Sequence, residues 1–81
     1  MDLSDEKAFL VKADIDIEQA HRRIFRQSEI VNELQQDGHD TKSAITLLAT
    51  LQETLNAMIE HRRLIIEHIE RLEREEKGPS R

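Results

Sequence analysis

Mostly apolar residues recur along this chain at alternating steps of three and four on both sides of one glycine, Gly38. A spacing of 3.5 residues kept over this many turns is typical of helices that pack as a left-handed coiled coil. We call these positions the seam. Before the glycine they are Leu3, Glu6, Leu10, Ala13, Ile17, Ala20, Ile24, Gln27, Val31 and Leu34. After it they are Ala44, Leu48, Leu51, Leu55, Met58, Arg62, Ile65, Ile69 and Leu72.

The stretch from Asp37 to Thr41 is the only turn signal inside the chain. Gly38 suits the left-handed conformation that ends many helices, and Asp40 or Thr41 can cap the helix that follows. Because the link is short, the two helices are expected to be antiparallel neighbours. The sequence therefore predicts an all-α fold, an antiparallel two-helix hairpin that forms one domain over residues 1–81. It comprises a helix over about 4–37, a turn at 38–40, a helix over about 41–77 and a frayed tail at 78–81.

The position of the turn also predicts which residues of the two helices meet. If the turn centres near residue 39, Leu10 meets Ile69, and Ala13 meets Ile65 or Ile66. Small seam residues of the first helix then oppose large ones of the second, as an interdigitating core requires.

Charged residues are expected to cover the outside of the helices, and one of them, Arg62, occupies a position of the seam. Arg62 should lay its stem over the core and turn its guanidinium toward Asp14 and Glu18. Pairs four residues apart with the acid first stabilise helices by a few tenths of a kcal/mol each. Such pairs are Glu18–Arg22, Glu67–Arg71, Glu70–Arg74 and Glu73–Lys77.

Composition narrows the classes of function. Gly occurs twice and Pro once, too few for the turns of an all-β fold. The absence of Cys excludes disulfides and thiolate metal sites, and Trp and Tyr, the usual anchors of binding pockets, are absent too. A net charge of −5 disfavours nucleic acid as a partner. No stretch approaches the ~20 apolar residues of a membrane span, and the acidic start is no signal peptide. We therefore expect a cytoplasmic protein without a membrane partner. The short length and the composition predict neither a cofactor nor enzymatic activity.

The turn and the helix after it resemble a known sequence pattern. The pattern is Gly38-His39-Asp40-Thr41 followed by Ala44, Leu47-Leu48, Leu51, Thr54-Leu55, Met58 and His61-Arg62. It is similar to a pattern in short uncharacterised helical proteins of alphaproteobacteria, and it covers about half of the chain. The resemblance implies a bacterial protein and no particular activity.

Four histidines could carry chemistry near neutral pH: His21, His39, His61 and His68. Glu18 and His21 have the Glu-x-x-His spacing of di-metal bundles, but both flank the seam, whereas metal ligands must project inward. His61 and His68 lie seven residues apart on one side of the second helix, and two exposed ligands bind a metal weakly. We therefore predict no metal site.

Histidine phosphotransfer is the catalytic alternative. The dimerisation modules of histidine kinases are helical hairpins that form four-helix bundles and expose one histidine. Either His21 or His61, which Glu60 precedes, could accept phosphate in this way. Both depart from the phospho-accepting pattern, because neither has an acid directly after it or a proline a few residues later. A phosphotransfer or dimerisation module of a signalling system is thus the alternative function.

Two further features carry little chemistry. A basic patch is formed by Arg22, Arg23 and Arg26. We expect these arginines to pair with acids such as Glu18 and Glu29. They are not expected to bind nucleic acid, because no aromatic residues for base stacking lie between them. No strained turn presents a serine as a nucleophile. The serines are Ser4, Ser28, Ser43 and Ser80.

More apolar residues flank the seam than two helices can cover between them, which usually marks an interface. Two hairpins related by a two-fold axis would cover them by forming a four-helix bundle, as would an amphipathic helix of another protein. The chain is therefore predicted to be a small non-catalytic protein–protein interaction module (an adaptor, scaffold or regulatory subunit) that acts as a homodimer or larger homo-oligomer. The predicted interface residues are Ile17, Ile24, Phe25, Leu48, Leu51, Leu55, Met58, Ile59, Ile65, Ile66 and Ile69.

Overall fold

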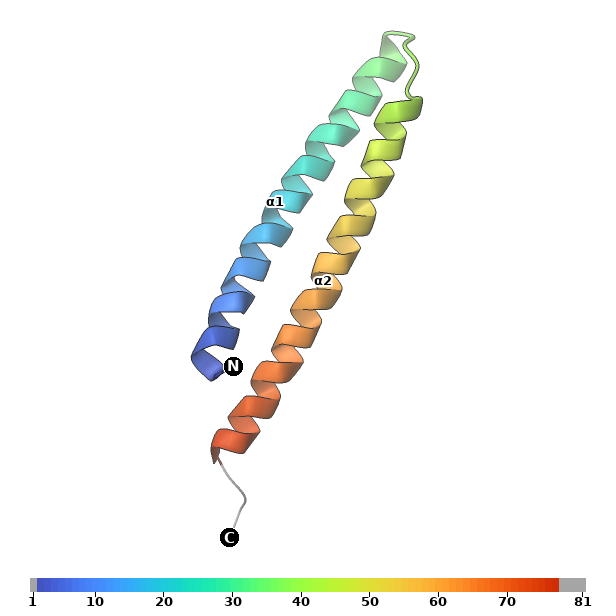
Figure 1. Cartoon of the computed structure of the whole chain (residues 1–81). Coiled ribbons are helices and arrows are strands. Elements are labelled where there is room, and N and C mark those ends of the chain that lie inside the picture. The colour runs from blue at the N-terminus through green and yellow to red at the C-terminus, as the bar shows by residue number, and fades with distance from the viewer. Residues whose placement is uncertain (1, 78–81) are drawn as a thin grey trace.

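Two long helices account for nearly all of residues 2–77, the part of the chain that the computed structural model describes. Helix α1 spans Leu3–Gln36 and helix α2 spans Lys42–Lys77. Figure 1 shows that they run antiparallel and side by side, with the start of α1 and the end of α2 at one end and the turn at the other. The predicted all-α hairpin is confirmed, and the helices begin and end within one residue of the expected positions. The predicted frayed tail at 78–81 lies outside the described residues.

Acidic side chains cap the start of both helices. The Asp2 carboxylate accepts a hydrogen bond of 2.9 Å from the backbone N–H of Asp5, so α1 begins one residue earlier than predicted. The Asp40 carboxylate likewise accepts one of 2.9 Å from the N–H of Lys42. Such caps satisfy N–H groups that have no partner within the helix, and their negative charge interacts favourably with the positive end of the helix dipole.

The turn is built on a left-handed glycine. Gly38 has a φ of 76°, and its N–H donates to the carbonyl of Gln35. The N–H of His39 donates to the carbonyl of Leu34, which completes the pair of bonds known as a Schellman motif. These bonds end α1 and reverse the chain within a few residues, so the geometry of the turn holds the two helices together as neighbours.

Replacing Gly38 by alanine is expected to lower the free energy of unfolding by about 1–2 kcal/mol, because an L side chain is strained at positive φ. A Cβ at Gly38 would meet nothing within 4 Å, so the cost is one of backbone conformation alone. Urea denaturation measures it. Gly38→Asn is the matched control and should cost less, since asparagine tolerates this conformation. Equal losses for both variants would contradict this account of the turn.

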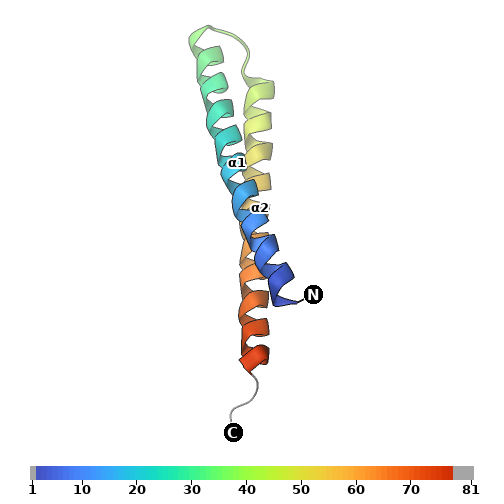
Figure 2. The ribbon, with the colours of Figure 1, turned by 90° about the vertical axis from the view of Figure 1, so that its left-hand side faces the viewer.

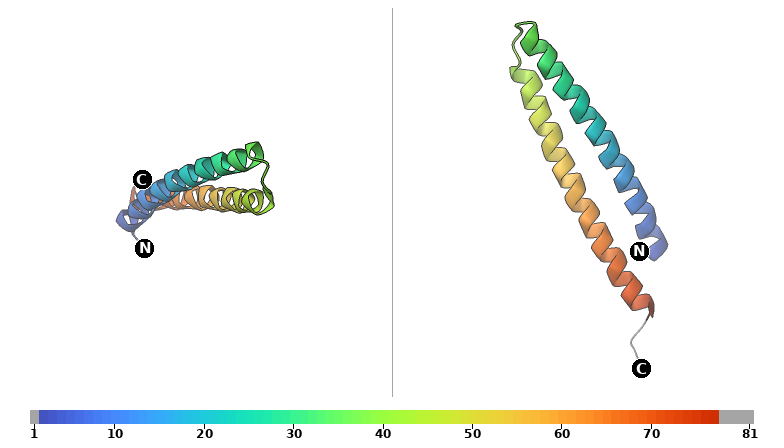
Figure 3. Two further views of the ribbon diagram at one scale, coloured as in Figure 1. Left: turned by 90° about the horizontal axis from the view of Figure 1, so that it is seen from above. Right: turned by 180° about the vertical axis from the view of Figure 1, so that it is seen from behind.

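Every seam position of both helices is buried or half-buried, as predicted. Ala13, Ile65 and Ile69 form a buried cluster against which Leu3 and Leu10 pack, in agreement with the expected register. In Figure 2 the two helices lie side by side near the turn, whereas further along α1 passes in front of α2. The left view of Figure 3, from above, also shows the helices apart near the turn and overlapping toward the start of α1, whereas the right view shows them side by side. The helices therefore wind around each other along the seam, as a 3.5-residue period requires.

Polar side chains also join the two helices across the seam. The Arg62 guanidinium binds the Asp14 carboxylate at 2.5 Å, as predicted. The buried Gln27 side chain donates a hydrogen bond of 2.9 Å to the carbonyl of Ala44 at the start of α2. Because each side chain has a partner on the other helix, these seam positions stay polar without a buried unpaired group.

The surface ion pairs near the end of α2 differ from the predicted ones. Glu67 binds Arg63 rather than Arg71, and Glu73 lies 3.9 Å from Lys7 of α1 rather than beside Lys77. Glu18 pairs with Arg22 as expected, and so it does not join Arg62. Another predicted pair, between Glu70 and Arg74, is not formed within residues 2–77. The predictions for Glu67 and Glu73 were wrong because a glutamate side chain can also pair with a basic residue that precedes it or that lies on the other helix.

Candidate functional site

The hairpin has an unusually thin core for a chain of its size. Among the described residues no side chain is completely withdrawn from solvent, and the most buried apolar one, Leu55, is 4% exposed. Large apolar side chains remain exposed on both helices. They are Phe9, Val11, Ile15, Phe25, Ile45, Ile59, Leu47 and Leu64, with exposed fractions of 40–68%. Contiguous exposed apolar surface is typical of interaction sites, so the placement of these side chains decides what they can do.

A groove runs between α1 and α2 along one side of the hairpin. It consists of hollows that share lining residues: His61 lines three of them, and Phe9, Asp16 and Arg23 line two each. We call this the groove side. Its lining residues from α1 are Glu6, Phe9, Lys12, Ala13, Asp16, Gln19, Ala20, Arg22, Arg23, Arg26 and Gln27, and those from α2 are Leu47, Leu51, Met58, His61, Leu64, Ile65, Glu67, His68 and Arg71.

The groove results from the size of the seam residues of α1. Ala13 and Ala20 occupy seam positions on this side, and their short side chains leave the larger residues of α2 partly uncovered. Met58 and Leu51, which share a hollow with Ala20, are only half-buried as a result. The floor of the groove is therefore apolar, which is the character of a surface that packs against side chains from another helix.

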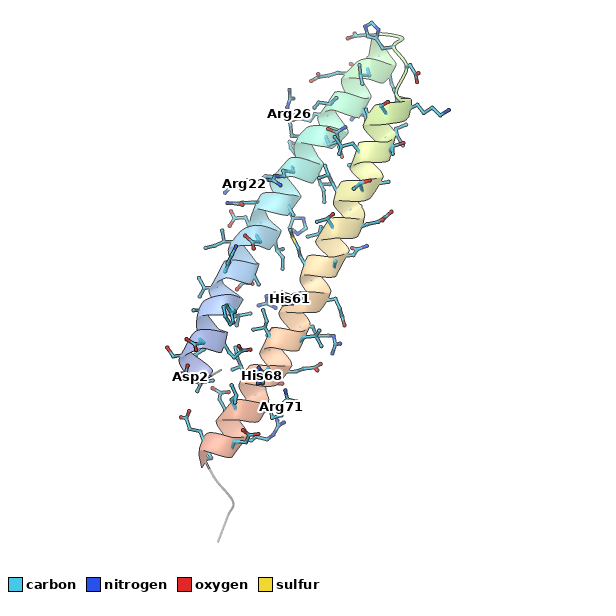
Figure 4. The ribbon with its side chains drawn as sticks, viewed as in Figure 1. Asp2, Arg22, Arg26, His61, His68 and Arg71 are labelled. Carbon is cyan, nitrogen blue, oxygen red and sulfur yellow. The ribbon has the colours of Figure 1, made fainter. Side chains whose placement is uncertain are left out.

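A buried carboxylate lines the groove at the end of the hairpin opposite the turn. Glu6 is 5% exposed, and its carboxylate lies 2.7 Å from Nδ1 of His68 on α2. Figure 4 shows His68 and His61 on the edge of α2 that faces α1. His68 was predicted to be an exposed residue on the same side as His61, but only His61 is exposed, because His68 turns toward Glu6. His68 thus gives the buried carboxylate at this seam position a partner on the other helix.

The predicted basic patch is largely neutralised by neighbouring acids. Arg22 binds Glu18 at 2.6 Å. Arg26 lies 3.7 Å from Glu29 and 3.8 Å from Glu33. Figure 4 shows Arg22 and Arg26 on the same helix, towards the turn. Arg23, in contrast, makes no ion pair within the part of the chain that the structure describes, although it lines the groove.

The geometry gives no support to the metal sites weighed from the sequence. Glu18 and His21 are exposed, and the Glu18 carboxylate binds Arg22. Nowhere within residues 2–77 do three His, Asp or Glu side chains come together as a metal site requires. The exposed His39 lies in the turn, apart from the other histidines.

Among residues 2–77, neither histidine considered for phosphotransfer forms a hydrogen bond or ion pair with an acid. His21 and His61 are both exposed, which phosphate transfer would need. However, the Glu60 carboxylate accepts hydrogen bonds of 3.0 and 2.6 Å from Arg63. These bonds hold the pKa of Glu60 below its usual value, and they direct its charge toward Arg63.

The predicted interface residues fall into three groups. Nine of the eleven are buried or half-buried within the single hairpin, and two are exposed. Leu55, Ile65 and Ile69 are buried, Ile17, Ile24, Leu48, Leu51, Met58 and Ile66 are half-buried, and Phe25 and Ile59 are exposed. The predicted set omits Phe9, Asp16 and Arg23, which line the groove; their common seven-residue spacing beside the seam is the signal that could have identified them.

No family model, curated protein or solved structure matches the chain. Among the described residues, neither helix has the length of apolar sequence that crossing a membrane requires. The function proposed below therefore rests on the chain's own residues and their geometry.

Proposed function

We propose that this chain is a small non-catalytic protein–protein interaction module that acts as a homo-oligomer. Two hairpins pack into a four-helix bundle, and the assembled bundle serves as an adaptor, scaffold or regulatory subunit. The proposal is supported by the amount of surface that one hairpin leaves exposed.

The accessible surface of the hairpin is 6327 Å². A compact monomer of the same mass exposes about 5,000 Å². The excess is roughly 1,300 Å², whereas a stable interface of standard size buries about 800 Å² on each partner. The hairpin thus carries more surplus surface than a dimer interface of ordinary size needs.

The shape of the hairpin supports the same proposal. Its radius of gyration is 19.0 Å, and it measures 70 × 16 × 15 Å. A compact domain of this length has a radius of gyration of about 12 Å. A rod of two helices has one packed layer, and a second pair of helices would give the seam residues the additional neighbours found in bundle cores.

Mass measurement tests the proposal. Sedimentation equilibrium of the full chain is expected to give at least twice the 9.5 kDa of one copy. The thermal midpoint should also rise with protein concentration, because association stabilises the folded state by mass action. A helical 9.5 kDa species whose thermal midpoint does not depend on concentration would contradict the homo-oligomer. A partner helix from another protein would then have to cover the exposed surface.

A further inference from the structure

We propose that the second copy docks on the groove side, antiparallel to the first. The two-fold axis is at right angles to α1 and passes between Gln19 and Ala20. It places α1 against α1 of the second copy and α2 against its α2. The inference rests on the proposed function, to which it adds the face and the orientation of the dimer.

One row of α1 side chains on the groove side is complementary to itself. The row is Phe9, Asp16, Arg23 and Ile30, at steps of seven residues. Its two outer members are apolar, and the two inner ones have opposite charges. Because the row is symmetric about the point between Gln19 and Ala20, the two-fold axis brings Asp16 opposite Arg23 and Phe9 opposite Ile30. Each contact forms twice, as an isologous interface requires.

The charges of this row lack full compensation in the single hairpin. Arg23 has no ion pair among residues 2–77, and Asp16, whose side chain is 38% exposed, binds only the exposed Lys12. Both residues line the hollow that also contains Gln19 and Ala20, where the proposed axis passes. Opposite charges at matching positions on two surfaces fix the register and orientation of an interface.

The opposite side of the hairpin is a poorer surface for a second α1. The corresponding row of α1 there is polar throughout. It consists of Lys7, Asp14, His21, Ser28 and Gln35. Lys7 and Asp14 already bind Glu73 and Arg62 of α2. Packing α1 against its copy on that side would remove these polar groups from water without giving them complementary partners, which costs free energy.

Charge reversal provides a direct test, because the proposed contacts pair unlike residues. Asp16→Arg would place two arginines at each contact in a homodimer, and Arg23→Asp would place two aspartates there. We expect either variant to dimerise about a hundredfold more weakly than the natural chain. An equimolar mixture of the two variants should recover dimerisation, since every contact in the mixed dimer again joins an arginine and an aspartate. Native mass spectrometry distinguishes the mixed dimer from both homodimers by mass.

Two controls keep the result interpretable. Circular dichroism should show the same helix content in all variants, since Asp16 and Arg23 lie on the surface of a folded helix. Arg74→Asp makes the same charge change at an exposed residue of α2 that has no ion pair within residues 2–77, and it should leave the dimer intact.

The outcomes separate this inference from the proposed function. If the natural chain is a dimer and both single variants dimerise equally well, the groove side is not the interface and this inference is wrong. If the single variants are monomers but their mixture stays monomeric, the antiparallel arrangement is wrong. A natural chain that is itself a monomer would overturn the proposed homo-oligomer as well.

Discussion

Leu55→Asp is expected to unfold the hairpin. Leu55 is the most buried apolar residue in the described part of the chain, at the middle of α2 where the seam side chains of both helices meet. Removing a buried leucine costs about 2–5 kcal/mol, and a buried carboxylate without a partner adds a further penalty of about 1–3 kcal/mol. The sum reaches the total stability of many small domains, about 5–15 kcal/mol. Circular dichroism should show loss of most of the helix signal, and the proposed dimer should dissociate.

The same substitution at an exposed leucine is the matched control. Leu64 lies on α2 as well but is 50% exposed, so aspartate there should leave the helix content almost unchanged. A Leu55→Asp protein with the full helix signal and an unchanged mass would contradict the assigned seam.

The seam was predictable because both helices keep one period over their whole length. Positions that are spaced alternately by three and four residues lie on one face of a helix, whatever residue occupies them. Glu6 and Gln27 therefore proved buried although they are polar, and Arg62 proved half-buried with its guanidinium on Asp14. The turn was predictable for an equally local reason, since glycine adopts the positive φ that the chain reversal needs at the lowest cost.

Contacts beside the seam could not be predicted in the same way. Whether His68 reaches Glu6 or stays in water depends on the rotation of each helix about its axis, which the period leaves open by tens of degrees. The choice of Glu73 for Lys7 depends on the register at the open end, far from the turn that sets it. The apolar register at the open end is the predicted one, so the failures there concern the rotamers of long charged side chains, as in the Arg63–Glu67 pair within α2.

The partner surface was the hardest part to predict for a different reason. The seam residues of a two-helix hairpin also face the centre of a four-helix bundle, so sequence alone does not separate contacts within one copy from contacts between copies. The structure shows which side chains the single hairpin itself covers. Leu55 is buried within the hairpin, whereas Phe9 and Arg23 are exposed.

The Glu6–His68 pair gives the second prediction, in which two substitutions act in opposite directions. His68→Ala is expected to lower the free energy of unfolding by about 1–2 kcal/mol, because the buried Glu6 carboxylate loses its nearest partner. The value is below the 3–5 kcal/mol of a broken, fully buried pair, since the His68 side chain is 33% exposed. His21→Ala is the matched control. His21 is exposed on α1, so its removal should change the stability by less than about 0.5 kcal/mol.

Glu6→Leu is expected to raise the free energy of unfolding by about 1 kcal/mol, because it removes a buried charge and places an apolar side chain against Ile65 and Phe9. Urea denaturation of all three variants at one protein concentration keeps any contribution from association constant. If Glu6→Leu instead destabilised the protein as much as His68→Ala does, the pair would be a net source of stability. The glutamate would then occupy the seam because it strengthens the hairpin. The expected rise means that Glu6 costs the single hairpin stability, as a buried charge does even when it has a partner.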